Sequence, residues 1–327
     1  MPKSTEKMPD LILVTGGAGF IGSHLCEALL QQGQRVLCVD NFCDFYSPAT
    51  KERNIAACLQ HPQFTLEKAD IRDREALEAI FERYQISAVI HLAAMAGVRP
   101  SLLDPELYTQ VNVMGTLNLL ELCKQHAIKQ FVFASSSSVY GNNTKLPFAE
   151  DDPVNEPISV YAATKKAGEL LCYTYHHLYR ISVVALRFFT VYGPRQRPDL
   201  AIHKFAALMR DGKELPVFGD EANSRDYTYI KDIIQGVLSA LEYTKTSCVY
   251  EVINLGNDRS IALSELIADL EEVTGLKAKL EHYADQAGDV HHTQASVTKA
   301  AQLLNYKPSF DFKTGLRLFW QWFTKGE

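Results

Sequence analysis

Long apolar runs are missing from this sequence. No stretch reaches the roughly eighteen apolar residues that a membrane-spanning helix needs. The polar segment from Met1 to Asp10 also has no apolar core of the kind found in signal peptides. We therefore expect a cytoplasmic protein with no membrane partner.

Cysteine pairs at metal-binding spacing are missing as well. The seven cysteines are odd in number and form no C-x-x-C pair, which argues against a disulfide framework and against a zinc site, so we expect no metal. Basic residues are not in excess: 33 Lys and Arg against 39 Asp and Glu give a net charge of -6. This balance gives no electrostatic reason to bind nucleic acid, and any phosphate ligand must be held by local features.

The chain has enough apolar material for a large core. Its 327 residues, 46% hydrophobic and 22% charged, have the composition of a globular protein and exceed the usual size of a single core. We predict one large and one small domain with a cleft between them.

Short apolar runs alternate with segments of helical spacing over most of the chain. The runs are nearly continuous, which predicts a parallel sheet covered by helices on both faces, the doubly wound or Rossmann arrangement of the α/β class. The predicted strands are Leu11–Val14, Arg35–Asp40, Phe64–Ala69, Ala88–Leu92, Gln130–Ala134, Ser182–Phe189 and Val249–Leu255. The predicted helices are Ile21–Leu30, Asp73–Tyr84, Pro105–His126, Val160–Tyr179 and Lys231–Tyr243.

The segment from Thr190 to Asp226 breaks this alternation. It is irregular, with Pro and Gly among charged residues, and we assign it to a smaller mixed α/β domain that closes over the carboxyl ends of the strands. The predicted boundaries are 10–190 plus 227–256 for the Rossmann domain and 191–226 plus 257–324 for the smaller, substrate-binding domain.

A glycine-rich motif, T-G-G-A-G-F-I-G, lies between the first strand and the first helix. Gly16, Gly19 and Gly22 permit a tight turn, close approach of a pyrophosphate and packing of helix on strand, while the helix N-terminus offers unpaired N–H groups. Asp40 ends the second strand 18 residues after Gly22, where its carboxylate can accept both ribose hydroxyls. The same charge would repel a 2′-phosphate, which favours NAD over NADP as the cofactor.

Further cofactor contacts are predicted at the ends of the next strands. Asp70 is a candidate contact to the adenine, although it fits equally well as the N-cap of the helix near Asp73. The remaining predicted contacts are Phe20, Ile21, Asn41, Ile71, Leu92, Ala93 and Ala94.

Tyr161 and Lys165 lie four residues apart on a predicted helix, hence on one face of it. An adjacent ammonium and a cationic nicotinamide both favour the phenolate, so Tyr161 can act as a base. Lys165 can also hold the nicotinamide ribose, and a hydroxyl from the preceding serine run can relay the proton. By itself a Y-x-x-x-K pair also occurs on surface helices, where the lysine stem stacks on the ring.

Together, T-G-G-A-G-F-I-G, Asp40, the serine run and Y-A-A-T-K resemble the extended short-chain dehydrogenase/reductase family across nearly the whole chain. The stretches S-S-S-S-V-Y-G (Ser135–Gly141) and R-F-F-T-V-Y-G-P-R-Q-R-P-D (Arg187–Asp199) resemble UDP-glucuronate 4-epimerases within it. The resemblance implies a catalytic role for Ser136 beside Tyr161 and Lys165. Dehydratases of this fold carry an acidic pair where this chain has Ser137 and Ser138.

The resemblance also implies contacts to the nucleotide of the substrate. A-G-V-R-P-S matches the glucuronate group and would turn Arg99 toward the diphosphate, Arg225 matches a more widely shared diphosphate-binding arginine, and Asp289 matches a nucleotide-ribose contact. Thr190 and Gln286 replace the Asn and Arg that are usual in UDP-galactose 4-epimerases.

Two residues that follow the ribose contact depart from the family pattern. His291 and His292 stand where small and acidic residues are expected, so their role is left open.

The function implied is inversion at C4 of UDP-glucuronate to UDP-galacturonate through a 4-keto intermediate. Because that intermediate is a β-keto acid, an epimerase must hold its carboxylate out of line with the carbonyl π system. Hydroxyls of Ser137, Ser138 and Thr190 can do so, helped by Arg197. The serines also fit a polar strand end, and Arg195 and Arg197 also fit solvated loop charges.

Other functions share the same residues. Epimerisation of UDP-glucose or UDP-N-acetylglucosamine would use the same triad, decarboxylation of UDP-glucuronate would begin in the same way, and a non-catalytic NAD-sensing module would not need the triad. Apolar positions on Tyr108–Leu122 and Val160–Tyr179 suit the helix pairing of a homodimer, and equally suit burial within one chain.

Overall fold

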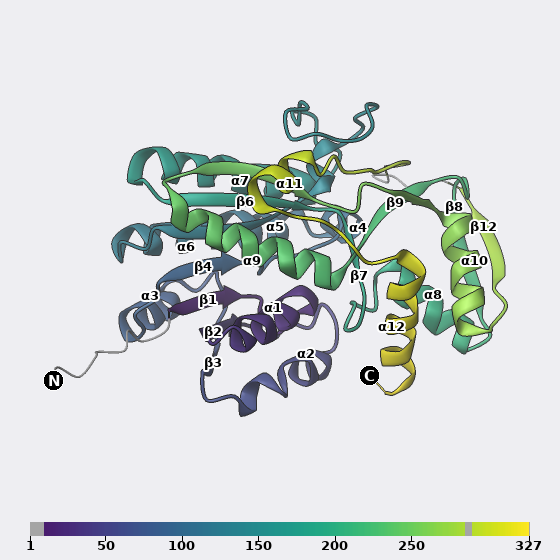
Figure 1. The fold of residues 1–327 in the computed structure, drawn as a ribbon, viewed down its shortest axis with the longest axis horizontal. Helices are drawn as coiled ribbons and strands as arrows, with labels where there is room; N and C mark the ends of the chain where they lie inside the picture. The colour runs from purple at the N-terminus through teal and green to yellow at the C-terminus, as the bar shows by residue number, and fades with distance from the viewer. Residues whose placement is uncertain (1–9, 285–289, 327) are drawn as a thin grey trace.

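A computed structural model describes residues 10–284 and 290–326. Its centre is a seven-stranded, all-parallel sheet in the order β10-β6-β5-β4-β1-β2-β3 (Figure 1). The order reverses next to β1, which is the doubly wound topology and confirms the predicted fold class. The strands are β1 Leu11–Thr15, β2 Arg35–Asp40, β3 Phe64–Lys68, β4 Ala88–His91, β5 Gln130–Ser136, β6 Ser182–Phe188 and β10 Tyr250–Leu255.

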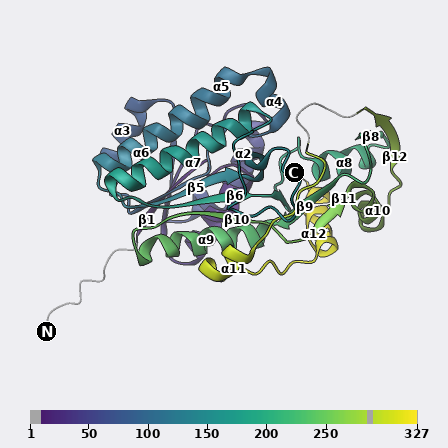
Figure 2. The same ribbon diagram turned by 90° about the horizontal axis from the view of Figure 1, so that it is seen from above.

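Helices cover both faces of this sheet, and the alternation of side chains along each strand divides the core between them. In β1, Ile12 and Val14 belong to a cluster with α1 and α9, whereas Leu11 and Leu13 belong to one with α3, α6 and α7. Figure 2 shows α6 and α7 on one side of the sheet and α9 on the other. These helices are α1 Phe20–Gln31, α3 Arg74–Arg83, α6 Thr116–Gln125, α7 Val160–Tyr179 and α9 Ile230–Thr246.

The helix predicted from Pro105 to His126 is helical as far as Gln125, but it is not α-helical throughout. It consists of α5 (Pro105–Thr109), a π-helical segment (Gln110–Gly115) and α6. Within the π-helical segment, Asn112 accepts a hydrogen bond from Met95 N at 2.8 Å and donates one to Met95 O at 3.0 Å. The irregular segment thereby fixes the loop that follows β4, and π-helical insertions of this kind are common at functional sites.

The segment from Thr190 to Asp226, expected to be irregular, contains regular elements, so that prediction was wrong. It holds short strands and one helix, and its second strand includes Pro216, which is tolerated because this strand has a single neighbour. One small sheet has the order β11-β9-β7 and another pairs β12 with β8. These elements are β7 Thr190–Tyr192, α8 Ala201–Arg210, β8 Glu214–Phe218, β9 Ser224–Tyr229, β11 Ser260–Ala262, α10 Leu263–Thr274, β12 Lys279–Tyr283 and α12 Phe312–Thr324.

Shorter helices complete the described chain. Among them α11 falls within 257–324, a range predicted for the smaller domain, and packs against α9 and β10 of the large sheet. The domain boundaries stay a prediction. They are α2 Pro48–Ile55, α4 Val98–Leu103, α11 Thr298–Leu304 and two 3₁₀ turns, Cys58–Gln60 and Ser137–Tyr140.

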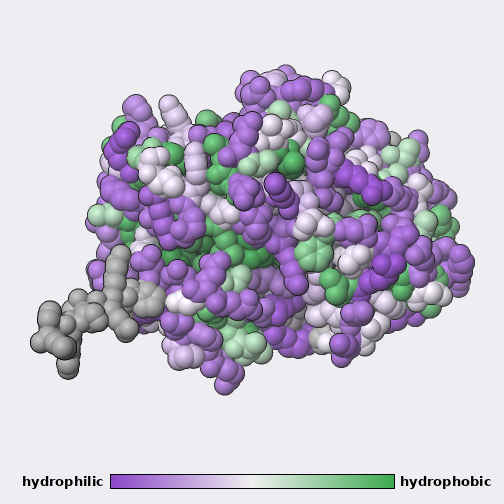
Figure 3. Space-filling model, viewed as in Figure 1, coloured by the Kyte–Doolittle hydropathy of each residue, from purple (hydrophilic) through white to green (hydrophobic). Residues whose placement is uncertain are grey.

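The face of the molecule drawn in Figure 3 is mainly hydrophilic. On the face drawn in Figure 3, apolar side chains form small patches between charged and polar ones. No helix in the described part of the chain is long and apolar enough to cross a membrane.

Candidate active site

A cavity of about 790 Å³ lies at the carboxyl ends of the parallel strands. This edge is where ligands bind in doubly wound sheets. The cavity wall brings together these predicted site residues: Gly16, Gly19, Phe20, Ile21, Gly22, Asp40, Asn41, Asp70, Ile71, Leu92, Ala93, Ala94, Ser136, Ser138, Tyr161, Lys165, Thr190 and Arg197. It does not include Ser137, Arg99 or Arg225. Asp289 and Gln286 lie outside the described residues.

The glycine turn after β1 leaves no room for side chains. A Cβ on Gly16, whose φ is +70°, would lie 2.8 Å from Ala93 N, and a Cβ on Gly22 would lie 2.2 Å from Gly16 O. Helix α1 begins at Phe20 with no side-chain hydrogen bond at its N-cap. The turn is therefore a backbone cradle below an uncapped helix N-terminus, which fits the diphosphate of a dinucleotide.

Asp40 is buried at the end of β2, at one end of this cradle. Its carboxylate accepts hydrogen bonds from Ala18 N at 3.1 Å and from Phe42 N at 2.8 Å. Lys51, on α2, is also buried, and its ammonium lies 3.9 Å from the Asp40 carboxylate. This cation was missed in the sequence because α2 is a separate element that only the fold brings back to β2.

Asp70 lies beside the same end of the cavity. It accepts a hydrogen bond from Asn41 Nδ2 at 2.8 Å and pairs with Arg72 at 2.8 Å. Its hydrogen bond with Arg72 lowers the pKa of Asp70 to about 2. The N-cap of α3 is Asp73, whose side chain accepts from Ala76 N at 3.0 Å, so the alternative role of Asp70 as that cap was wrong.

Tyr161 and Lys165 lie on the first turns of α7, which begins at Val160 because Ser159 caps it. Lys165 donates a hydrogen bond to Ala134 O at 2.7 Å, and its nitrogen lies 5.9 Å from the centroid of the Tyr161 ring. Burial lowers the pKa of Lys165 to about 8. Burial raises the pKa of Tyr161, whereas a hydrogen bond with Ser136 and the charge of Arg197 lower it. An additional cation near the phenol is what base catalysis by Tyr161 requires.

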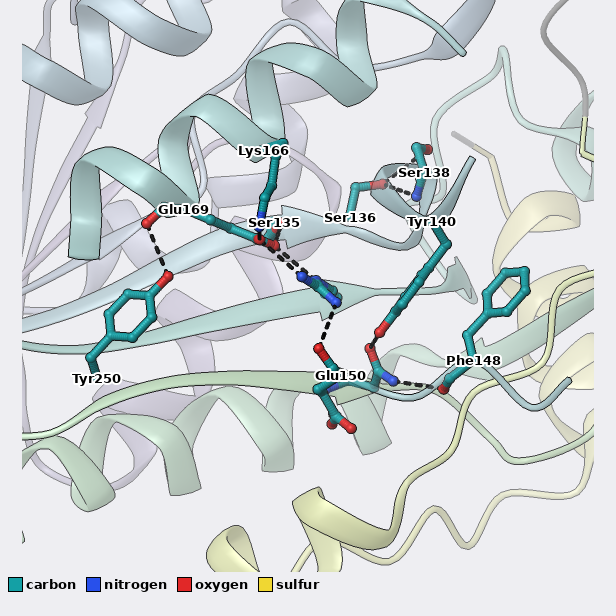
Figure 4. Close-up of polar contacts among 11 residues, drawn as sticks. Ser135, Ser136, Ser138, Tyr140, Phe148, Glu150, Lys166, Glu169 and Tyr250 are labelled. Carbon is teal, nitrogen blue, oxygen red and sulfur yellow. Dashed lines mark hydrogen bonds and ion pairs between the residues drawn. The ribbon is translucent and has the colours of Figure 1, made fainter. Parts of the chain in front are cut away.

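The serines at the end of β5 have different hydrogen-bond partners. Figure 4 shows Ser135 turned to the buried carboxylate of Glu169, which it reaches at 2.7 Å. Ser136 Oγ instead donates to Ser138 Oγ at 3.1 Å, and Ser135, Ser136 and Ser138 all line the cavity. The 3₁₀ turn that starts at Ser137 causes this divergence, and it leaves Ser137 outside the cavity.

The arginine-rich loop after β7 packs on the large sheet's helices. Arg195 donates to Glu27 on α1 at 2.6 Å, and His24 on α1 is hydrogen-bonded to Pro194 O at 2.9 Å. Arg197 forms a two-pronged pair with Asp199 at 2.9 and 2.8 Å. The side chains of both arginines are about 20% exposed, 21% and 18%, so the alternative that they are solvated charges was wrong.

Arg99 and Arg225 lie beyond the cavity wall. The Arg99 guanidinium stands 5.1 Å from the ring centroid of Phe218, and Arg225 donates to Ser224 O and to His291 O at 3.1 Å each.

The two histidines whose role was open both contact the start of β9. His291 is hydrogen-bonded to Asn223 Oδ1 at 3.0 Å, and His292 to Ser224 Oγ at 3.0 Å.

Comparison with known proteins agrees with this geometry. The family model described as GDP-mannose 4,6 dehydratase matches residues 13–319. A UDP-glucuronate 4-epimerase of Thermodesulfobacterium geofontis is 45% identical over 95% of both chains. The chain belongs to the extended short-chain dehydrogenase/reductase family. Within that family it falls among the NAD-dependent UDP-sugar epimerases, which confirms the resemblance found in the sequence.

Solved structures of this family have the same fold. UDP-glucuronic acid 4-epimerase of Bacillus cereus, in complex with UDP-glucuronic acid and NAD, is 39% identical with a TM-score of 0.89 over 96% of this chain and 99% of that one. UDP-glucose 4-epimerase of Thermus thermophilus, in complex with NAD, is 31% identical with a TM-score of 0.87 over 97% and 100%. The structural relatives of this chain thus bind NAD, while their sugar substrates differ.

Several residues of this epimerase-family site were missed in the sequence. Lys51 and Tyr46 line the cavity from the loop and helix after β2, and Asn112 holds the loop after β4. The sequence analysis considered Arg187 only as the first residue of a motif and Glu169 only as part of a helix, and it did not predict the ion pair between them. A buried charge in an otherwise apolar strand, as at Arg187, is the signal that could have revealed this pair.

Proposed function

We propose that this protein is a UDP-glucuronate 4-epimerase that uses NAD and interconverts UDP-glucuronate and UDP-galacturonate through a 4-keto intermediate. The observation that carries the proposal is that Tyr161, Lys165 and Ser136 share one cavity with Ser138, Thr190 and Arg197. The first three supply proton transfer, and the second three supply hydroxyls and a cation suited to a sugar carboxylate. The relatives described above support the same substrate.

The cavity has a fitting place for the cofactor. The glycine cradle and the N-terminus of α1 would hold its diphosphate, Asp40 its adenosine ribose, and Lys165 its nicotinamide ribose. When bound, NAD supplies a reversible acceptor for the C4 hydrogen of the sugar. The buried carboxylate of Asp40 favours NAD over NADP, since a 2′-phosphate there would meet a like charge.

The chain's own residues would move the proton. Tyr161 takes it from the 4-hydroxyl and later returns it to the 4-oxygen, when the C4 hydrogen is returned to the opposite face of C4, with Ser136 within hydrogen-bonding reach of the phenol. Lys165 keeps its ammonium beside the ring and thereby stabilises the phenolate. Arg197 adds a second positive charge on this side of the cavity.

The residues around the sugar favour epimerisation over the related reactions. Ser138 and Thr190 offer hydroxyls that can hold the carboxylate away from alignment with the C4 ketone and so limit loss of carbon dioxide. Ser137 lies outside the cavity, so this role rests on the other two hydroxyls and on Arg197. With serine at both positions of the acidic pair, the site lacks the acid that a dehydratase uses.

Purified protein incubated with UDP-glucuronate tests the proposal. We expect UDP-galacturonate as the product, separated by anion-exchange chromatography, with Tyr161→Phe as the inactive control. UDP-xylose or a 4-ketopentose would instead identify a decarboxylase. Conversion of UDP-glucose or UDP-N-acetylglucosamine, with none of UDP-glucuronate, would identify a neutral-sugar epimerase, and full activity of the Tyr161→Phe protein would remove the triad from the reaction.

The neutral-sugar epimerase is the second candidate, because a relative of 31% identity is a UDP-glucose 4-epimerase of the same fold.

A homodimer is also part of the proposal. Leu170 and Tyr173 on α7 and Met114 beside α6 are about half exposed, which suits helix pairing between two copies.

A further inference from the structure

Tyr46 carries a buried hydroxyl with no hydrogen-bond partner among the described residues. It lies in the loop between β2 and α2, and its side chain is part of the cavity wall. Buried hydroxyls in native proteins are almost always hydrogen-bonded, because leaving one unpaired is costly. The missing partner of a buried hydroxyl, on a side chain that lines a ligand cavity, points to a polar group of the ligand.

The position of the hydroxyl identifies that group. A Cβ built on Gly19 would lie 3.9 Å from Tyr46 Oη, so the hydroxyl stands directly beside the glycine cradle. The N-cap of α1 is at Gly19 and has no side-chain hydrogen bond. An uncapped helix N-terminus and a phenol donor converge here on one small volume, and together they suit an anion with several acceptor oxygens.

The ring of Tyr46 has a cation beside it. The Lys51 ammonium lies 5.0 Å from the ring centroid and donates to Cys43 O at 2.9 Å. Burial raises the pKa of Tyr46 far above 10, so the hydroxyl keeps its proton and can only serve a phosphate as a donor. The charge of Arg197 acts in the opposite direction on the pKa of the same group.

We infer that Tyr46 is a ligand of the cofactor diphosphate, donating its hydroxyl to a phosphate oxygen above Gly19. Tyr46 belongs neither to the glycine motif nor to the ribose site at Asp40. The inference rests on the proposed function only because it takes NAD as the molecule bound in the cavity. Its consequence is slow release of NAD. An epimerase returns the C4 hydrogen within one turnover and gains nothing from exchanging its cofactor.

The test compares Tyr46→Phe with the wild type, both loaded with radiolabelled NAD. Release of the label is followed after addition of excess unlabelled ADP-ribose, which competes for the same cradle. A hydrogen bond to a charged group predicts release about ten-fold faster, or more, from the variant. The affinities of ADP-ribose and of adenosine for the nucleotide-free proteins are then measured by isothermal titration calorimetry. We expect weaker binding of ADP-ribose to the variant and unchanged binding of adenosine, which has no phosphate.

Tyr306→Phe is the matched control. The Tyr306 hydroxyl is also buried but has a partner, Gly256 O at 2.9 Å, and Tyr306 is not part of the cavity wall. We expect this variant to melt at a lower temperature than the wild type and to release NAD at the wild-type rate. Tyr46→Phe should show the reverse, faster release with no loss of thermal stability in the nucleotide-free protein.

Two outcomes would overturn the inference. One is NAD release from Tyr46→Phe at the wild-type rate, and the other is equal weakening of adenosine and ADP-ribose, which would show a general disturbance of the site. Failure of the wild type to retain NAD would instead contradict the proposed cofactor, and failure to convert UDP-glucuronate would contradict the proposed substrate. The four results are distinguishable.

Discussion

Glu169 and Arg187 form a two-pronged ion pair below the floor of the active site. The distances are 2.9 Å from Arg187 Nε to Oε1 and 3.0 Å from its Nη2 to Oε2, and neither side chain is more than 2% exposed. Ser135 donates to the same carboxylate from the end of β5 (Figure 4). The pair and this serine thus join α7, β6 and β5. Glu169 lies one helical turn after Lys165, and Ser135 directly precedes Ser136.

Removing one charge of this pair should destabilise the fold. In Glu169→Gln the buried Arg187 guanidinium keeps its charge without a counterion, so we expect the free energy of unfolding to fall by about 3–5 kcal/mol. Urea denaturation of the purified variant measures it.

Two further variants interpret that result. Glu169→Leu combined with Arg187→Met removes both charges and should recover most of the stability. Glu78→Gln breaks the more exposed pair with Arg74 and should cost less than about 1 kcal/mol. A loss for Glu169→Gln as small as that for Glu78→Gln would show that the buried pair is not needed.

Tyr161→Phe should separate catalysis from cofactor binding. The phenol is the only group changed, so epimerisation is expected to fall by about 10²–10⁴-fold, the usual contribution of a general base. Bound NAD, measured by absorbance after denaturation and filtration, should stay at the wild-type ratio. Loss of both would assign Tyr161 a structural role instead.

The stability of the protein should decline in mild acid through His91. This imidazole is buried between Thr15 Oγ1 at 2.7 Å and Thr116 Oγ1 at 2.9 Å, and burial lowers its pKa from 6.5 to about 3. Between those values the unfolded chain binds a proton that the folded chain does not, so stability is lost as the pH falls below 6.5. The contribution of one such group is at most about 1.4 kcal/mol per pH unit.

His91→Gln keeps a polar side chain that does not titrate. Denaturation from pH 7 to pH 5 should show a shallower decline for this variant than for the wild type. The control is His177→Gln at an exposed position, which should follow the wild type. Parallel curves for His91→Gln and the wild type would contradict the account.

Gly22→Ala should damage the diphosphate cradle. The added methyl group would lie 2.2 Å from Gly16 O and 2.7 Å from Gly17 Cα, both of them backbone atoms that cannot move independently. We expect loss of retained NAD together with a lower melting temperature. Gly33→Ala meets no atom within 4 Å and should cost only the strain of its positive φ, about 1 kcal/mol, with NAD retention unchanged.

The sequence predicted those features that depend on local patterns. Continuous apolar runs such as Leu11–Val14 identified the strands of the parallel sheet, and helical spacing placed Tyr161 and Lys165 on one face of α7. The glycine motif predicted its turn because the sterics of Gly16 and Gly22 act within a few residues.

Features that depend on contacts between distant segments were not predictable in this way. The 3₁₀ turn after Ser136 separates Ser137 from the serines that line the cavity, and no periodicity reveals it. The π-helical segment around Asn112 interrupts an apolar pattern that reads as one helix. Lys51 and Tyr46 reach the cofactor cavity only because the loop after β2 folds back over the glycine turn.

The most direct test of the proposed chemistry uses UDP-glucuronate carrying deuterium at C4, incubated with the protein in ordinary water. If the C4 hydrogen is held within the site while Tyr161 exchanges only the hydroxyl proton, the UDP-galacturonate formed retains its deuterium at C4, as nuclear magnetic resonance would show. UDP-galacturonate with hydrogen from water at C4 would contradict the account.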